Sequence, residues 1–118
     1  LKHGDMGSTF GGGPLACALI EAVIGAIEED GLLPRVRKLS KLIRETCQVG
    51  PVTGIQGEGF LLGLRTTRPA RGIVDELLTK GILTGTSGDP NVVRLLPPLV
   101  LEEAHVVKLA QALSEVKP

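Results

Sequence analysis

The stretch Ile55-Gln56-Gly57-Glu58-Gly59-Phe60-Leu61-Leu62-Gly63 sets the fold class that we expect for this chain. It joins two extended segments, about 52–56 and 59–66, and Gly57-Glu58-Gly59 is expected to form a turn or bulge between them. In the second segment, apolar residues at 60, 62 and 64 alternate with residues 61, 63 and 65, which is the period of a half-buried strand. Two strands with so short a connection pair antiparallel.

The flanking sequence supplies helices and two more strands. Apolar residues at helical spacing predict four helices, at about 14–30, 32–46, 70–80 and 101–116. Short strands are expected at 82–84 and 91–95, on either side of a polar loop over 84–90. Two strand pairs with short connections exclude a fully parallel sheet. We therefore expect an α+β fold, with a small antiparallel or mixed sheet that carries helices on one face and follows a long helix.

Two details of the expected helices can be checked later. In the third helix we expect Ile73, Val74, Leu77 and Leu78 to face inward. The N-cap position of the last helix is expected to be Val100 or Leu101, neither of which offers a side-chain cap. His105 has no potential ligand at metal-binding spacing, so we interpret it as a structural or surface residue and expect no metal site.

Composition narrows the function classes. Thirteen basic and thirteen acidic residues give a formal net charge of zero, which argues against nucleic acid as a partner. No apolar run is long enough to cross a membrane, and no signal peptide is recognised. Two cysteines, Cys17 and Cys47, do not make a disulfide framework, and free thiols favour a cytoplasmic protein.

A glycine-rich loop, Gly7-Ser8-Thr9-Phe10-Gly11-Gly12-Gly13-Pro14, lies near the start of the chain. Pro14 suits the first turn of a helix, so the loop delivers two hydroxyls, from Ser8 and Thr9, to a helix N-terminus. Free amides and the positive end of the helix dipole attract anions there. The loop is a candidate cradle for phosphate or carboxylate, and a glycine loop without a ligand is the alternative. We divide the chain accordingly into a loop, 1–13, and a domain with its leading helix, 14–118.

Arg94 is the second candidate. It lies in an otherwise apolar strand segment, Asn91-Val92-Val93-Arg94-Leu95-Leu96-Pro97-Pro98-Leu99. A buried or half-buried guanidinium needs an anionic partner, either a carboxylate of the protein or a carboxylate of a ligand. The planar guanidinium suits the second role, and a strand arginine that points into solvent remains a further alternative.

Three strings of this sequence resemble the class III aminotransferases, pyridoxal-phosphate enzymes of fold type I. They are Gly4-Asp5-Met6-Gly7-Ser8-Thr9-Phe10-Gly11-Gly12-Gly13-Pro14-Leu15-Ala16-Cys17-Ala18, the 55–63 hairpin, and the Arg-x-x-Pro-Pro-Leu pattern at 94–99. Acetylornithine and ornithine aminotransferases are nearest in pattern. Met6 and Gly13 depart from the histidine and asparagine that are common there. The resemblance covers the whole chain, which matches the C-terminal third or so of the family, including its small C-terminal domain.

The resemblance implies roles for these residues. Thr9 would bind the phosphate of pyridoxal 5'-phosphate, Ser8 would contact the phosphate or the substrate, and Arg94 would bind the substrate α-carboxylate. The loop would reach the partner subunit of a homodimer. The reaction would transfer an amino group from acetylornithine to 2-oxoglutarate, a step of arginine biosynthesis.

The family's Schiff-base lysine precedes the glycine loop by a few tens of residues, so we regard this chain as a fragment that is inactive alone. The alternatives are another class III aminotransferase, acting on ornithine or 4-aminobutyrate, a free-standing α+β module that binds an amino acid or anion, and a purely structural dimerisation domain.

Overall fold

The structure of the chain, a computed structural model, describes residues 2 and 7–117. The chain divides into two compact units, residues 1–33 and 34–118. Of the expected cofactor loop over 1–13, residues 1 and 3–6, and with them Met6, lie outside the described residues. The expected boundary after residue 13 coincides with the start of a helix, and as a statement about domains it stays a prediction.

The first unit contains the glycine loop and helix α1, Pro14–Glu29. Gly13 precedes the helix in an extended conformation and Pro14 occupies its first turn, as expected. Gly31 follows the helix with a φ of +60°. No residue of α1 is buried, although the helix carries the large apolar side chains Leu15, Leu19, Ile20, Val23 and Ile24. Its apolar surface is therefore available for packing, as its stripe of apolar residues indicates.

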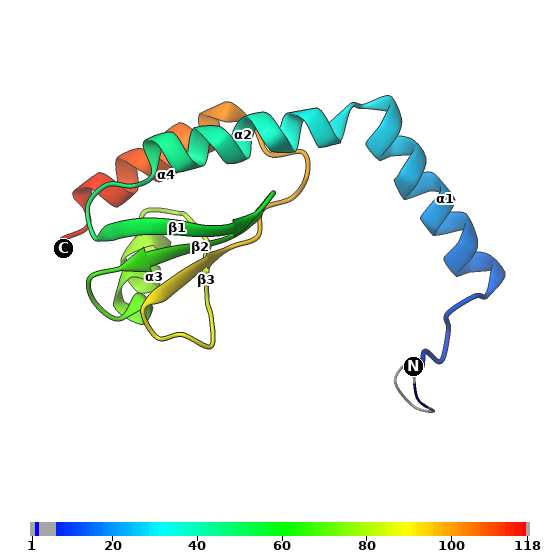
Figure 1. Cartoon of the computed structure of the whole chain (residues 1–118), viewed down its shortest axis with the longest axis horizontal. Coiled ribbons are helices and arrows are strands. Elements are labelled where there is room, and N and C mark those ends of the chain that lie inside the picture. Colours follow the sequence, from blue (N-terminus) through cyan, green and yellow to red (C-terminus); the bar gives the residue numbers. More distant parts are fainter. Residues whose placement is uncertain (1, 3–6, 118) are drawn as a thin grey trace. The chain divides into compact units, whose positions relative to one another are not determined.

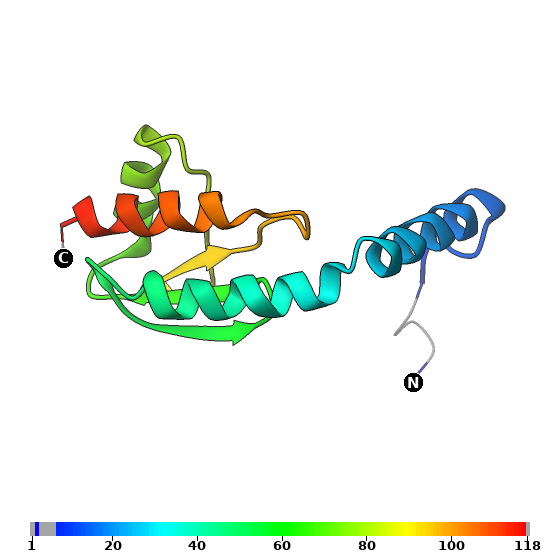
Figure 2. The same cartoon turned by 90° about the horizontal axis from the view of Figure 1, so that it is seen from above.

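The second unit holds a four-stranded antiparallel sheet and the remaining helices. The elements in chain order are α2 (Leu32–Thr46), β1 (Val52–Glu58), β2 (Leu61–Thr66), α3 (Ala70–Thr79), β3 (Gly85–Thr86), β4 (Val92–Leu95) and α4 (Glu103–Glu115). The strand order across the sheet is β1-β2-β4-β3, and every neighbouring pair is antiparallel. Figures 1 and 2 show α2 and α4 running close together along the sheet. The expected α+β class is confirmed.

One face of the sheet forms the hydrophobic core with the helices. Leu62 and Leu64 of β2 lie opposite Leu95 and Val93 of β4, and all four are at most 6% exposed. Helices α2, α3 and α4 supply the other side of this core, chiefly through Val36, Leu39, Ile43, Ile73, Leu77, Val106, Leu109 and Leu113. The alternation expected in β2 is confirmed, because Leu61 and Arg65 are exposed. Val74 is half-buried, whereas Leu78 is 55% exposed and does not face inward as predicted.

The β1–β2 hairpin is tighter than expected. Gly57 and Glu58 belong to β1, and Glu58 pairs with Leu61 around a turn formed by Gly59 and Phe60. Gly59 has a φ of +53° and Gly57 a φ of +102°, conformations that favour glycine. A Cβ on Gly57 would lie 2.1 Å from the Leu61 carbonyl oxygen. The irregularity of the hairpin lies instead between Val52 and Gly54.

The prediction of a strand at 82–84 is wrong. The strand is formed instead by Gly85 and Thr86, which pair with Arg94 and Val93, and residues 82–84 lie outside it. On the partner side, β4 ends at Leu95 and is followed by Pro97 and Pro98, which have no N–H to donate. The two chain segments consequently separate beyond the Gly85–Arg94 pair.

The start of α4 also differs from the prediction. The helix begins at Glu103 with Glu102 at its N-cap, two residues after Val100. The Glu102 N–H donates to Nδ1 of His105 at 3.2 Å, which uses the imidazole to satisfy a free amide at the helix start. His105 thus has the structural role that we expected.

Side chains of α2 hold two neighbouring parts of the fold. Arg35 Nε donates to the Leu101 carbonyl at 3.0 Å, just before α4 begins. Arg44 donates to the carbonyls of Ile55 (3.2 Å) and Gly57 (2.5 Å) on β1. Gln48, just after α2, donates to the Thr53 carbonyl at 3.1 Å.

Within residues 2 and 7–117, no helix combines the length and apolar character required to span a membrane.

Candidate ligand site on the open face of the sheet

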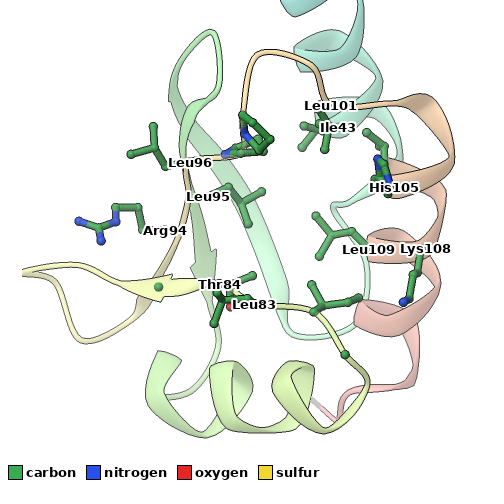
Figure 3. A pocket seen from close by; sticks show the side chains of 16 residues that line it. Ile43, Leu83, Thr84, Arg94, Leu95, Leu96, Leu101, His105, Lys108 and Leu109 are labelled. Carbon is green, nitrogen blue, oxygen red and sulfur yellow. The ribbon is translucent and has the colours of Figure 1, made fainter.

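The sheet has a second face, which the helices of the second unit do not cover. Because side chains alternate along a strand, Arg94 points to this open face while its neighbours Val93 and Leu95 point into the core. Figure 3 shows this division: Leu95 extends toward α4, and Arg94 extends away from it on the other side of β4. The guanidinium is exposed, so the buried or half-buried setting considered from the sequence does not occur.

Arg94 lies between two glycines on the adjacent strands. It pairs with Gly63 of β2 on one side and with Gly85 of β3 on the other. The guanidinium leans over Gly85, where an added Cβ would lie 3.3 Å from Nη2 and 3.5 Å from Nε. Neither neighbour therefore covers the Arg94 side chain, and the absence of a Cβ at residue 85 leaves room for its present position.

Within residues 2 and 7–117, no carboxylate neutralises Arg94. Among the residues that the structure describes, its side chain makes no ion pair and no hydrogen bond. Arg68, by contrast, pairs with Glu76 at 2.6 Å. An unengaged guanidinium retains all of its donors for an external anion, and its planar geometry matches a carboxylate.

A groove of about 340 Å³ lies beside Arg94 on the open face. Its lining includes Gly63, Val92, Gln56, Leu61 and Ser87. The Ser87 hydroxyl is already engaged, because it donates to the Asp89 carbonyl and accepts from the Asp89 N–H. Of the expected polar loop over 84–90, Gly85 and Thr86 form β3, and residues 87–91 connect β3 to β4.

A larger cavity of about 690 Å³ lies on the helix side of β4. It opens where the 82–84 segment separates from residues 95–98, and Figure 3 shows Leu95, Ile43 and Leu109 around it. Its lining is mostly apolar, and the Thr84 hydroxyl beside it is buried without a hydrogen-bond partner among the described residues. Arg94 borders this cavity, but its guanidinium is directed away from it.

Ser8 and Thr9 lie in the other unit, in the glycine loop before α1. Both are exposed. The α1 N-terminus has no side-chain cap, so the first amides of the helix remain available to an anion. Gly11 allows close approach to Ser8, because an added Cβ would lie 2.9 Å from the Ser8 Cβ. Hydroxyls and free helix amides are donors of the kind that bind a phosphate group.

The sequence indicated Arg94, Ser8 and Thr9, but it did not indicate the surroundings of Arg94. Gln56 and Gly85 are 38 and 9 residues away along the chain and reach Arg94 only through strand pairing. The one available signal was the pair of glycines at 63 and 85. Their significance depends on the strand order, which the sequence alone did not provide.

The sequence of this chain is similar to that of a known protein family. Residues 1–116 match the profile of the class III aminotransferases. The chain is 36% identical over 98% of its length to an acetylornithine aminotransferase of Methanocaldococcus jannaschii, of which it covers 30%.

Solved structures of aminotransferases are similar in fold to this chain. The acetylornithine aminotransferase of Elizabethkingia anophelis superposes with a TM-score of 0.81 at 29% identity, covering 98% of this chain and 32% of that one. An ornithine aminotransferase of Toxoplasma gondii, with pyridoxal phosphate at partial occupancy, gives a TM-score of 0.80 at 27% identity, covering 98% of this chain and 30% of that one. The chain spans about 30% of the length of these relatives. On this evidence it belongs to the class III aminotransferase family.

Proposed function

We propose that the full-length protein is a pyridoxal-phosphate-dependent aminotransferase that transfers the amino group of acetylornithine to 2-oxoglutarate. The observation that carries this proposal is Arg94, a guanidinium beside a groove and without an ion-pair partner in the described part of the chain, which belongs to the class III family. The relatives named as acetylornithine aminotransferases support the choice of substrate. The role would place the protein in arginine biosynthesis, in the cytoplasm.

Arg94 would bind the α-carboxylate that amino-acid and 2-oxo-acid substrates share. Two parallel N–H···O bonds would fix the orientation of that group as well as its position. The paired residues on either side, Gly63 and Gly85, carry no side chain that could cover the guanidinium. Because the side chain has no partner among the described residues, binding would not require an existing ion pair to break.

Thr9 and Ser8 would hold the cofactor. The phosphate would accept hydrogen bonds from the Thr9 hydroxyl and from the free amides at the start of α1, with Ser8 beside it or against the substrate. When bound, pyridoxal phosphate supplies the electron sink that amino-group transfer requires. The protein's share of the work is to bind and orient the two reactants.

The resemblance to the family adds two proposals about the assembled enzyme. The glycine loop would contact a cofactor held by the other subunit of a homodimer. The lysine that anchors the cofactor would come from a part of the full-length protein outside these 118 residues, so the 118-residue chain alone would be inactive. None of the lysines here lies in a motif that matches that residue.

The proposal is tested with purified full-length protein carrying Arg94→Lys. This change keeps the charge and loses the two-pronged geometry, so KM for 2-oxoglutarate should rise and kcat/KM should fall roughly 30- to 1000-fold. The melting temperature should stay near that of the wild type, because the side chain is exposed.

Arg65→Lys is the matched control. Arg65 is also exposed on the open face, on β2, but does not line the groove, and its replacement should leave KM unchanged. A wild-type enzyme without transfer activity on acetylornithine or related ω-amines would refute the proposed function. A large loss of stability with an unchanged KM would remove Arg94 from the site.

A further inference from the structure

Strand register places four residues in one line across the open face of the sheet. Gln56 of β1 pairs with Gly63 of β2, Gly63 pairs with Arg94 of β4, and Arg94 pairs with Gly85 of β3. We refer to Gln56, Gly63, Arg94 and Gly85 as the Arg94 row. Its two members with long side chains, Gln56 and Arg94, are separated by one glycine, and Cγ1 of Val92 also lies over that glycine, 2.8 Å from the position that a Cβ of Gly63 would occupy.

The Gln56 side chain extends toward Arg94. Its Cγ and Nε2 lie 3.2 Å and 3.4 Å from the position that a Cβ of Gly63 would occupy. Neighbouring strands are about 4.8 Å apart, so β1 and β4 are separated by roughly 10 Å. By lying over Gly63, the amide of Gln56 crosses about half of that separation and faces the groove beside Arg94.

The Gln56 amide is not used for structure. Among the described residues it makes no hydrogen bond, whereas Gln48, a few residues earlier, donates to the Thr53 carbonyl at 3.1 Å. Of the polar side chains that line the groove, Ser87 is engaged with Asp89. Gln56 and Arg94 are the two that remain unengaged within the described chain, and they border the same space.

We propose that Gln56 is a second substrate-binding residue, whose side-chain amide N–H donates to the carboxylate that Arg94 binds. The inference rests on the proposed function and deepens it. A carboxylate has about four acceptor positions and a two-pronged arginine uses two of them, which leaves an acceptor for the amide. Because the amide is neutral, it adds a donor from β1 without adding a second cation to the groove.

The test uses the full-length enzyme with its cofactor and compares two substitutions of Gln56. Gln56→Leu keeps the approximate size and removes the donor, so KM for 2-oxoglutarate should rise about tenfold while kcat at saturation changes little. Gln56→Glu should raise KM more, by about 100-fold, because its carboxylate pairs with Arg94 and repels the substrate. A role limited to packing over Gly63 would give the opposite ranking, since glutamate matches the shape of glutamine more closely than leucine does.

A double substitution tests whether Gln56 and Arg94 bind the same group. In an Arg94→Lys background, Gln56→Leu should change KM by less than about threefold, because residues that share one ligand are not additive. An unchanged tenfold effect would contradict the proposal. Gln48→Leu is the control for replacing a glutamine elsewhere, and its KM should equal that of the wild type.

The outcomes separate this inference from the proposed function. A wild-type enzyme that does not transfer amino groups overturns both. An active wild type, with KM raised by Arg94→Lys but unchanged by both Gln56 substitutions, overturns the role of Gln56 alone. All variants are compared at equal cofactor occupancy, measured by absorbance, so that a change in KM reports substrate binding.

Discussion

The two faces of the four-stranded sheet are built from alternate residues of the same strands, and they differ in their surroundings. On the core face, Leu62, Leu64, Val93 and Leu95 are at most 6% exposed and contact three helices. On the open face, the same two central strands present Gly63 and Arg94. Core packing and the proposed ligand binding thus fall on alternate positions of the same strands. Substitutions one residue apart should therefore have effects of different kinds.

The largest expected effect is on the core face. Leu64 is fully buried, so Leu64→Ala should lower the free energy of unfolding by about 2–5 kcal/mol through lost burial and the cavity left behind. Urea denaturation of the 118-residue chain measures this loss. Leu61→Ala, on the same strand but 58% exposed, is the matched control and should cost less than about 0.5 kcal/mol. Equal losses for the two variants would contradict the division between the faces.

A smaller effect is expected at Gly63, an open-face position that is itself enclosed. A Cβ on Gly63 would lie 2.8 Å from Cγ1 of Val92 and 3.2 Å from Cγ of Gln56. Gly63→Ala should therefore lower the free energy of unfolding by about 1–3 kcal/mol, because the neighbours must move. Gly88→Ala meets no atom within 4 Å and serves as the control. A stabilised Gly63→Ala variant would show that the Arg94 row has more space around residue 63 than the contacts of Gly63 indicate.

The smallest effect concerns the pH dependence of stability, which involves the thiol of Cys47 in the core. Burial raises the pKa of the Cys47 thiol above its ordinary value of 9.0, and the hydrogen bond between Cys47 and Thr46 acts in the opposite direction. Above about pH 9 the unfolded thiol loses its proton while the folded one keeps it. The unfolded state then binds fewer protons, so stability falls as pH rises, by up to about 1.4 kcal/mol per pH unit.

Cysteine variants isolate this dependence. Unfolding measured between pH 8 and 10 should show the additional slope in the wild type and in Cys17→Ala, since Cys17 is exposed. Cys47→Ala should lack it. The same slope in all three proteins would mean that other groups cause the decrease.

Local sequence patterns predicted the elements whose boundaries are set locally. Helix α2 has the expected bounds because Val36, Leu39 and Ile43 give it a clear apolar face after Gly31. The 82–84 segment was predicted wrongly because pairing at that edge depends on a partner that ends in prolines. The start of α4 was missed because Glu102 and His105 satisfy it in a way that cap preferences do not anticipate.

The candidate site was predictable only in part, for a related reason. Arg94 stands out in the sequence as a charged residue within an apolar strand. Gln56 does not, since its approach to Arg94 requires β1 to pair with β2, β2 with β4, and a glycine to lie between them. Strand order is a property of the whole fold, so residues that depend on it become evident only in three dimensions.

The hydrogen bonds from Arg44 and Gln48 to β1 also determine how this sheet can meet other polypeptides. They occupy the carbonyls of Thr53, Ile55 and Gly57, alternate groups along the outer edge of the strand. An incoming strand would have to displace these donors before it could pair there, which protects the longest edge from aggregation. In the described chain no side chain bonds to the main chain of Gly85 or Thr86 at the opposite edge. Within the part of the chain that the structure describes, side-chain donors therefore block extension of the sheet at β1 and do not block it at β3.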